Sequence, residues 1–272
     1  MRSLQQNDLS HKSININSTE ITNIISYPRF DKKGYLDRME EIDSLGIKCV
    51  LYGGRSQIGK IAIAGKGCVS LVLKAISQNN ITCALKIRRM DANRSDMERE
   101  VELHKMANSV GVGPEIIGHS KNTILMDFVE GLSIIDWMKQ DNNIVESESV
   151  LRVSIDILEQ CHLLDTIHLD HGQLSYLDHH AIISNSNKAS LIDFESSSNQ
   201  RRPSNVTCAT QSLLLSGFIS KRINNILGLQ NKKEQLIQTL KYSFFKHHKT
   251  GLTFINKFRF LCFHQTLSCY EA

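Results

Sequence analysis

Two glycine-rich segments with a lysine beside them could bind phosphate. Gly65-Lys66-Gly67-Cys68-Val69-Ser70-Leu71-Val72 has the form G-x-G-x-x-S-x-V and lies between two strand-like runs. Glycines in such a turn let backbone N–H groups approach phosphate oxygens with no Cβ in the way. The alternative is residues 54–61, which have the spacing of a P-loop. A P-loop joins a strand to a helix and needs a hydroxyl where Ile61 stands, so we expect the phosphate loop at 65–72.

Polar residues of the kinds that act on phosphate follow the glycines along the chain. Lys86 ends the apolar run Cys83-Ala84-Leu85-Lys86, and Glu100 lies on a predicted helix, with Glu98 and Glu102 as alternatives. Later segments carry the other polar groups, in His168-Leu169-Asp170-His171-Gly172-Gln173-Leu174-Ser175, Asp178 and Ile192-Asp193-Phe194-Glu195.

Two smaller groups of side chains leave alternatives open. Paired histidines could bind a metal, either His168 with His171 or His179 with His180, but no carboxylate stands at ligand spacing on a helix. The adjacent Arg201-Arg202 could bind a phosphate or pair with surface carboxylates.

The ordered set resembles the predicted archaeal serine/threonine protein kinases, atypical relatives of the RIO-type kinases. The resemblance runs from Tyr27-Pro28 to about Tyr242. Its motifs are Gly-Lys-Gly-Cys at 65–68, Asp-His-Gly-Gln-Leu-Ser at 170–175, Ile-Asp-Phe-Glu at 192–195 and Arg-Arg-Pro-Ser-Asn-Val-Thr at 201–207. The resemblance implies an α+β, bilobal protein-kinase-like fold, Mg-ATP binding and phosphoryl transfer.

The resemblance also implies roles for single residues. Lys86 would neutralise the nucleotide phosphates and pair with Glu100, and His171, Gln173 and Asp193 would belong to the catalytic segments. Residues 125–131 are similar to the kinase hinge, where Met126 is the gatekeeper and the Asp127 carbonyl and Val129 amide read adenine. The implied nucleotide contacts are Gly65, Lys66, Gly67, Val72, Ala84, Lys86, Met126, Asp127 and Val129, and the implied magnesium ligands are Asp178 and Asp193.

Three residues depart from the kinase pattern. Gln173 stands where kinases have the catalytic aspartate, Asp178 replaces the metal-binding asparagine, and Glu195 replaces the glycine of D-F-G. A glutamine cannot accept a proton at neutral pH, but it can orient a nucleophile. Because phosphoryl transfer depends mainly on positioning and charge neutralisation, slow catalysis is expected.

The predicted strands are concentrated before residue 130 and most predicted helices follow it, which indicates an α+β protein. We expect a loose lead-in at 1–26, and helices at 31–45, 93–108, 147–162 and in three stretches after 210. We expect strands at 47–52, 58–64, 69–75, 81–88, 115–118 and 122–129, with a hairpin at 181–194. The expected domains are a lead-in with a short helix (1–46), a first lobe (47–130) and a second lobe with a basic helical tail (131–272).

Composition and charge limit the partners of the protein. The net charge of +4 divides into +7 for residues 211–272 (nine Lys/Arg, two Glu) and −3 for the rest. A basic tail could meet an acidic or ribonucleoprotein partner, or could simply be a solvated helix face. The seven cysteines form no C-x-x-C pair, so we expect neither disulfides nor a metal cluster, and a cytoplasmic location. No apolar run is long enough to predict a membrane span.

The sequence thus predicts an enzyme, an ATP- and Mg-dependent atypical protein kinase that transfers the γ-phosphate to Ser/Thr of a protein substrate. The alternative is a pseudokinase, or an ATP-switched binding protein that acts through its basic tail. Gln173 is the residue that separates these two hypotheses.

Overall fold

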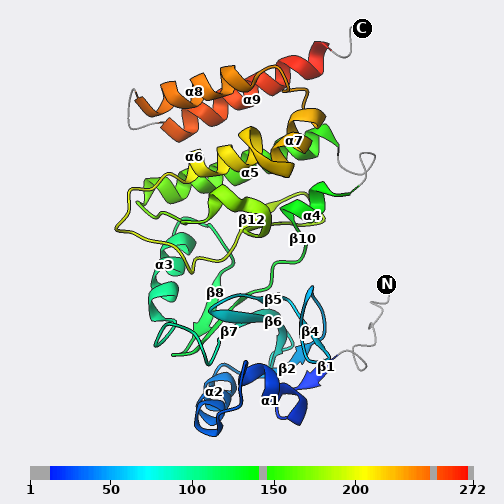
Figure 1. Ribbon diagram of the computed structural model, residues 1–272, viewed down its shortest axis with the longest axis vertical. Coiled ribbons are helices and arrows are strands. Elements are labelled where there is room, and N and C mark those ends of the chain that lie inside the picture. The colour runs from blue at the N-terminus through cyan, green and yellow to red at the C-terminus, as the bar shows by residue number, and fades with distance from the viewer. Residues whose placement is uncertain (1–12, 141–145, 246–249, 269–272) are drawn as a thin grey trace. The chain divides into compact units, whose positions relative to one another are not determined.

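The computed structural model describes residues 13–140, 146–245 and 250–268 (Figure 1). It is a mixed α+β structure with one large antiparallel sheet and helices. The chain forms two compact units, residues 1–102 with 115–128, and residues 103–114 with 129–272. The division between the two units falls inside helix α3 (Glu98–Asn108).

The first unit contains the large sheet. Its strands follow the order β1-β2-β6-β7-β9-β8, with β5 paired to β6, and all of these pairings are antiparallel. The strands are β1 (Ser13–Asn15), β2 (Ile47–Leu51), β5 (Gly65–Lys66), β6 (Ser70–Ser77), β7 (Thr82–Arg88), β8 (Ile116–His119) and β9 (Thr123–Asp127). Asn80 makes the β6–β7 turn with a positive φ of 59°, a conformation that asparagine tolerates, as expected for Asn79-Asn80.

Two helices cover one face of this sheet, α1 (Thr22–Ile25) and α2 (Lys32–Ser44), coloured blue in Figure 1. Their buried isoleucines share one apolar core with alternate residues of the strands, namely Ile24, Ile25, Ile42, Leu71, Leu73 and Leu85. Asp31 caps α2 by accepting a hydrogen bond from the Gly34 amide at 2.6 Å. The chain leaves α2 through Gly46, whose φ of +67° suits glycine.

The predicted loose lead-in is wrong from residue 13 onward. Strand β1 pairs with β2, and the 3-10 helix Thr19–Ile21 leads directly into α1. Ile14 lies on the strand and Ile16 lies just after its end, while Ile21, Ile24 and Ile25 have helical spacing, and all five are buried. Because Asn and Ser are abundant between these isoleucines, neither the strand-like nor the helical spacing is evident from the sequence. Residues 1–12, which the same prediction covered, lie outside the described part of the chain.

The strand predicted at 58–64 is in fact a two-stranded hairpin. β3 (Ser56–Ile58) pairs with β4 (Ile61–Ile63), and Gly59-Lys60 forms the turn, with Gly59 at φ +59°. Lys60 therefore stands between two strands, with no helix after it. This geometry excludes a P-loop at residues 54–61.

The second unit is built around helix α5 (Ser147–Thr166), which buries one side in the largest apolar core. A small antiparallel sheet accompanies it, in the order β10 (Leu132–Ser133), β11 (Ala181–Ile183) and β12 (Ala189–Leu191). The other helices are α4 (Ile134–Met138), α6 (Asn205–Thr210), α7 (Gly217–Ile226), α8 (Lys233–Phe245) and α9 (Thr250–Ser268), with a 3-10 helix at Leu174–His179 and a π-helical turn at Gln211–Leu215. Helix α9 packs on both α5 and α8 (Figure 1).

Most other predicted elements are present with shifted ends. Helix α3 begins at Glu98 rather than at residue 93, because Asp96 accepts a hydrogen bond from the Glu98 amide and so acts as its cap. Helix α5 continues to Thr166, beyond the predicted end at 162. The predicted hairpin is confirmed as β11 and β12, with Asn187 in the turn at φ +57°.

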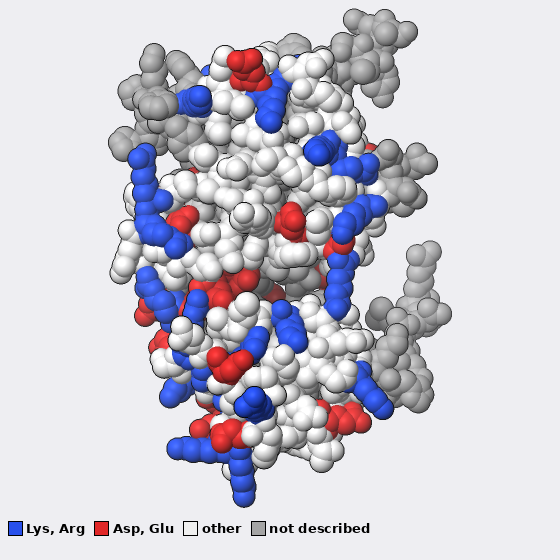
Figure 2. Space-filling view, viewed as in Figure 1, with Lys and Arg blue, Asp and Glu red and all other residues white. Residues whose placement is uncertain are grey.

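Among the described residues, charges of both signs are interspersed on the face shown in Figure 2. Several basic side chains of the tail bind groups of the second unit. Arg259 pairs with Glu159 at 2.9 Å, and Arg222 donates to the carbonyls of Met138 and Gln140. Lys246 and Lys249, which contribute to the predicted basic tail, lie outside the described residues.

The six cysteines that the structure describes are free thiols, and Cys269 lies outside the described residues. Among the described helices, none combines the length and the apolar character needed to cross a membrane.

Candidate functional site

The register of the large sheet brings several predicted nucleotide-binding residues onto one face. Val72 lies opposite Lys86, and Ala84 lies opposite Met126. Because residues two apart on a strand share a face, these four side chains stand on the same side of the sheet. That side is opposite to the one covered by α1 and α2. Gly65 on β5 pairs with Val72 and so continues the same row.

Lys86 and Glu100 form a buried ion pair within the first unit. Lys86 Nζ lies 2.5 Å from Glu100 Oε1, and the two side chains are only 5% and 2% exposed. Oε2 of Glu100 is buried and has no hydrogen-bond partner among the described residues. Of the alternatives, Glu98 is exposed, and Glu102 pairs instead with Arg99 on the helix surface. The helix therefore presents Glu100, and neither of its rivals, to the lysine.

The glycine segment forms the tight hairpin that joins β5 to β6. The Gly67 amide donates to the Ser70 carbonyl at 2.8 Å, and Arg89 Nη1 donates to the Gly67 carbonyl at 2.8 Å. Arg89 is itself fixed by Asp91, and its guanidinium lies 5.0 Å from the centre of the Tyr27 ring. Lys66, Gly67 and Cys68 are exposed. Sequence reasoning missed the clamp formed by Arg89 and Tyr27, which no motif indicates.

The segment predicted as a hinge ends strand β9. Met126 is half-buried and Asp127 is exposed, and the Asp127 amide donates to the Glu115 carbonyl at 2.9 Å. Lys74 shares the sheet face with Ala84 and Met126, and its Nζ lies 4.6 Å from the centre of the Phe128 ring. Val129 is half-buried and belongs to the second unit.

His171 is fully buried in the second unit and is held at both its backbone and its ring. Its amide donates to Asn205 Oδ1 at 2.9 Å, and its Nε2 lies 3.1 Å from the Ile192 carbonyl. Because a carbonyl can only accept, Nε2 carries the proton. Burial, and secondarily the charge of His180, lowers the pKa of His171 to about 4. His171 is therefore neutral at pH 7.

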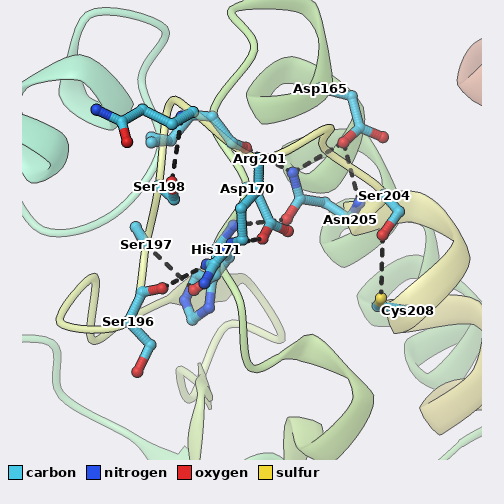
Figure 3. Close-up of polar contacts among 12 residues, drawn as sticks. Asp165, Asp170, His171, Ser196, Ser197, Ser198, Arg201, Ser204, Asn205 and Cys208 are labelled. Atoms are coloured by element: carbon cyan, nitrogen blue, oxygen red, sulfur yellow. Dashed lines mark hydrogen bonds and ion pairs between the residues drawn. The ribbon is translucent and has the colours of Figure 1, made fainter.

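Figure 3 shows how Asp165 and Asn205 fix the segment around His171. Asp165, at the end of α5, accepts hydrogen bonds from the Asn205 amide at 3.0 Å and from Asn205 Nδ2 at 2.8 Å. Asn205 Nδ2 also donates to the Leu169 carbonyl at 2.7 Å. Burial raises the pKa of Asp165. The sequence contains no signal for this link between α5, α6 and the loop.

Arg201 is paired with a carboxylate of its own unit. Its Nε donates to Asp170 Oδ2 at 2.8 Å, and its Nη2 donates to the Ser196 carbonyl at 2.6 Å (Figure 3). Gly172 lies beneath it at φ +85°, where a Cβ would come within 2.6 Å of both the arginine and that carbonyl. Of the two expectations for the arginine pair, carboxylate pairing therefore describes Arg201, while Arg202 is exposed.

Gln173, Asp178 and Asp193 all belong to the second unit. Gln173 is half-buried, and its Oε1 is buried with no hydrogen-bond partner among the described residues. Asp193 follows β12 with a φ of +70°, a conformation that is uncommon for residues other than glycine, Asn and Asp. Its carboxylate is 36% exposed, and Oδ2 lies 4.0 Å from Nδ1 of His180. The next residue, Phe194, is fully buried and stacks on His104.

The described residues contain no group of three or more His, Cys, Asp or Glu side chains that could hold a metal ion. His168 is exposed, whereas His171 is enclosed and donates to a carbonyl, so that pair does not form a metal site. Any divalent cation near Asp193 would therefore need further oxygen ligands from a bound phosphate or from water.

No protein-family model matches this chain, and no curated protein matches it.

Proposed function

We propose that the protein is an ATP- and Mg-dependent atypical protein kinase of bilobal, protein-kinase-like fold, which transfers the γ-phosphate to Ser/Thr of a protein substrate. The observation that carries the proposal is the buried Lys86–Glu100 pair on the sheet face of Val72, Ala84 and Met126. A buried ion pair seldom adds stability, because desolvation offsets the attraction between the charges. Its retention beside the apolar side chains of Val72, Ala84 and Met126 favours a functional role.

The residues of this face suit a nucleotide. Val72, Ala84 and Met126 offer apolar contact to a purine ring, while the ammonium group of Lys86 offers positive charge for phosphates. Glu100 holds that ammonium group through Oε1, and its Oε2 has no donor within the part of the chain that the structure describes. Bound Mg-ATP would supply the phosphoryl group and the cation that neutralises its charge.

The second unit offers groups for the acceptor and for the cation. Gln173 Oε1 is buried and accepts no hydrogen bond from the residues that the structure describes, which suits a hydrogen bond from a substrate hydroxyl. The carboxylate of Asp193, with Asp178 as the predicted second ligand, offers oxygen atoms to magnesium. His171, which is neutral and fixed, would hold the Asp193 turn through the Ile192 carbonyl.

The test combines nucleotide binding with phosphate transfer. Lys86→Met alone would leave Glu100 buried without its partner, at a cost of about 3–5 kcal/mol. The double variant Lys86→Met/Glu100→Gln removes both charges and avoids that penalty. We expect it to fold, to lose Mg-ATP affinity by at least about 10-fold and to transfer no phosphate from γ-labelled ATP.

The matched control is Lys48→Met, which removes an exposed lysine from strand β2 of the same sheet. Wild type and Lys48→Met should bind Mg-ATP equally in calorimetry. Equal affinity and turnover in the double variant would show that the assigned face does not bind nucleotide.

The second candidate is a pseudokinase or ATP-switched binding protein, and Gln173 favours it because an amide cannot act as a general base. In that case the wild type binds Mg-ATP but transfers no phosphate to itself or to added proteins. The same binding and transfer assays therefore separate the two candidates.

A further inference from the structure

His180 lies beside Asp193, although sequence reasoning considered it only as half of a two-histidine site with His179. Its Nδ1 is 4.0 Å from Asp193 Oδ2, and its side chain is 14% exposed. His179, in contrast, is exposed at the end of the 3-10 helix Leu174–His179. The two adjacent histidines therefore have different surroundings, and only His180 is placed next to the carboxylate.

Neighbouring groups fix both partners. The Ile192 amide donates to the His180 carbonyl at 3.0 Å, which ties the residue to the chain just before Asp193. The buried ring of His171 meets the His180 ring edge to face, with centroids 5.6 Å apart. Asp193 is held at φ +70°, and uncommon backbone conformations of this kind cluster at functional sites.

We propose that His180 and Asp193 together hold the divalent cation that accompanies the nucleotide, so that the protein prefers a first-row transition ion such as Mn²⁺ or Co²⁺ to Mg²⁺. The inference rests on the proposed function, which supplies the nucleotide. Two ligand atoms about 2.1 Å from one ion lie roughly 3 Å apart when cis and about 4.2 Å apart when trans. The observed 4.0 Å separation is close to the trans value, and a cis arrangement would need a small rotation of either side chain.

The ligand types decide which ion is preferred. Magnesium is a hard ion that prefers oxygen and keeps several waters. An imidazole nitrogen adds affinity along the series from Mn²⁺ through Co²⁺ to Ni²⁺. His180 Nδ1 lies 4.0 Å from the Asp193 carboxylate, so in this inference His180 takes the place of the predicted ligand Asp178 as the second protein ligand. Phosphate oxygens and water complete the coordination sphere.

Pulsed electron paramagnetic resonance of Mn²⁺ bound with a non-hydrolysable ATP analogue tests this directly. We expect nitrogen modulation from one imidazole, which changes to the ¹⁵N pattern when the protein alone is ¹⁵N-labelled. The modulation should disappear in His180→Leu and persist in the matched control His179→Leu. The isotope experiment uses wild-type protein, so even if His180→Leu does not fold it shows whether the nitrogen comes from the protein, and the modulation that persists in His179→Leu excludes the neighbouring histidine.

Calorimetry of the same nucleotide analogue with each ion gives an independent readout. Wild-type affinity should increase in the order Mg²⁺, Mn²⁺, Co²⁺, and His180→Leu should lose about 10–100-fold with Co²⁺ and much less with Mg²⁺. Manganese that binds with nucleotide but without imidazole coupling would overturn this inference and leave the proposed function intact. A protein that binds no nucleotide with any of these ions would overturn both.

Discussion

The oxygen of Gln173 is buried beside the segment that carries His171 and has no hydrogen-bond partner among the described residues. A buried oxygen without a hydrogen bond costs free energy. In the kinases that the sequence resembles, the residue at this position contacts the hydroxyl group that receives the phosphate, so the free oxygen of Gln173 favours the same role. If Gln173 positions the hydroxyl, Gln173→Ala should lower phosphate transfer by about 100-fold. Gln173→Asp should preserve or raise the rate, because a carboxylate can also take the proton.

Steady-state transfer from γ-labelled ATP to a panel of proteins measures this effect, with Ser175→Ala as the control. Ser175 is exposed two residues further along the same segment. Identical background rates in wild type and Gln173→Ala would contradict an active kinase. Nucleotide affinity should change little in either Gln173 variant.

At the scale of elements, Asn205 at the start of α6 connects two parts of the second unit. It binds Asp165 of α5 and both the Leu169 carbonyl and the His171 amide of the loop. Asn205→Ala leaves these groups buried with fewer partners, so we expect a loss of about 1–3 kcal/mol in unfolding free energy. Phosphate transfer should fall as well, because the loop loses its anchor.

Urea unfolding measures the stability change, and Asn225→Ala on α7 is the control. Asn225 is exposed, and its replacement should change the unfolding free energy by less than about 0.5 kcal/mol. Equal stability of wild type and Asn205→Ala would contradict the anchoring role.

How far the sequence predicts these elements depends on whether the signal is local. The alternating residues of β6 and β7 and the Asn79-Asn80 turn were recognisable, and so was the order of Lys86, His171 and Asp193. The Asp165–Asn205 link joins residues 40 positions apart, and His180 meets Asp193 only through the β11–β12 hairpin. Contacts of this kind are set by packing and register, which no local period reveals. For the same reason, the sequence did not indicate the hydrogen bond from Arg89 to the Gly67 carbonyl of the glycine hairpin.

At the scale of the whole molecule, His171 makes folding stability depend on pH. Its pKa is about 4 in the folded protein and about 6.5 when unfolded, so the folded state favours the neutral ring. The resulting stability is complete above pH 6.5 and is lost as the pH falls from 6.5 towards 4. Between pH 7 and pH 4.5 this group alone should lower the unfolding free energy by about 2–3 kcal/mol. The raised pKa of Asp165 acts in the opposite direction.

Urea unfolding at the two pH values, without metal or nucleotide, isolates this contribution. His171→Gln keeps a side-chain donor but cannot titrate, so its drop in stability should be smaller than that of wild type by about 2–3 kcal/mol. His168→Gln, which changes an exposed histidine, should behave like wild type. Equal drops in wild type and His171→Gln would contradict the assigned burial of the ring.

The glycine hairpin carries an exposed thiol, Cys68, in its turn. Burial raises the pKa of the Cys49, Cys83, Cys161 and Cys262 thiols, which reduces their fraction of reactive thiolate at neutral pH. Cys208 is only partly exposed and its sulfur contacts the Ser204 hydroxyl, so among the described cysteines the exposed Cys68 is the natural attachment point for an electrophilic fluorophore or a covalent inhibitor. A fluorophore attached to Cys68, in the loop expected to bind phosphate, would therefore report nucleotide binding to the proposed face without the introduction of a new cysteine.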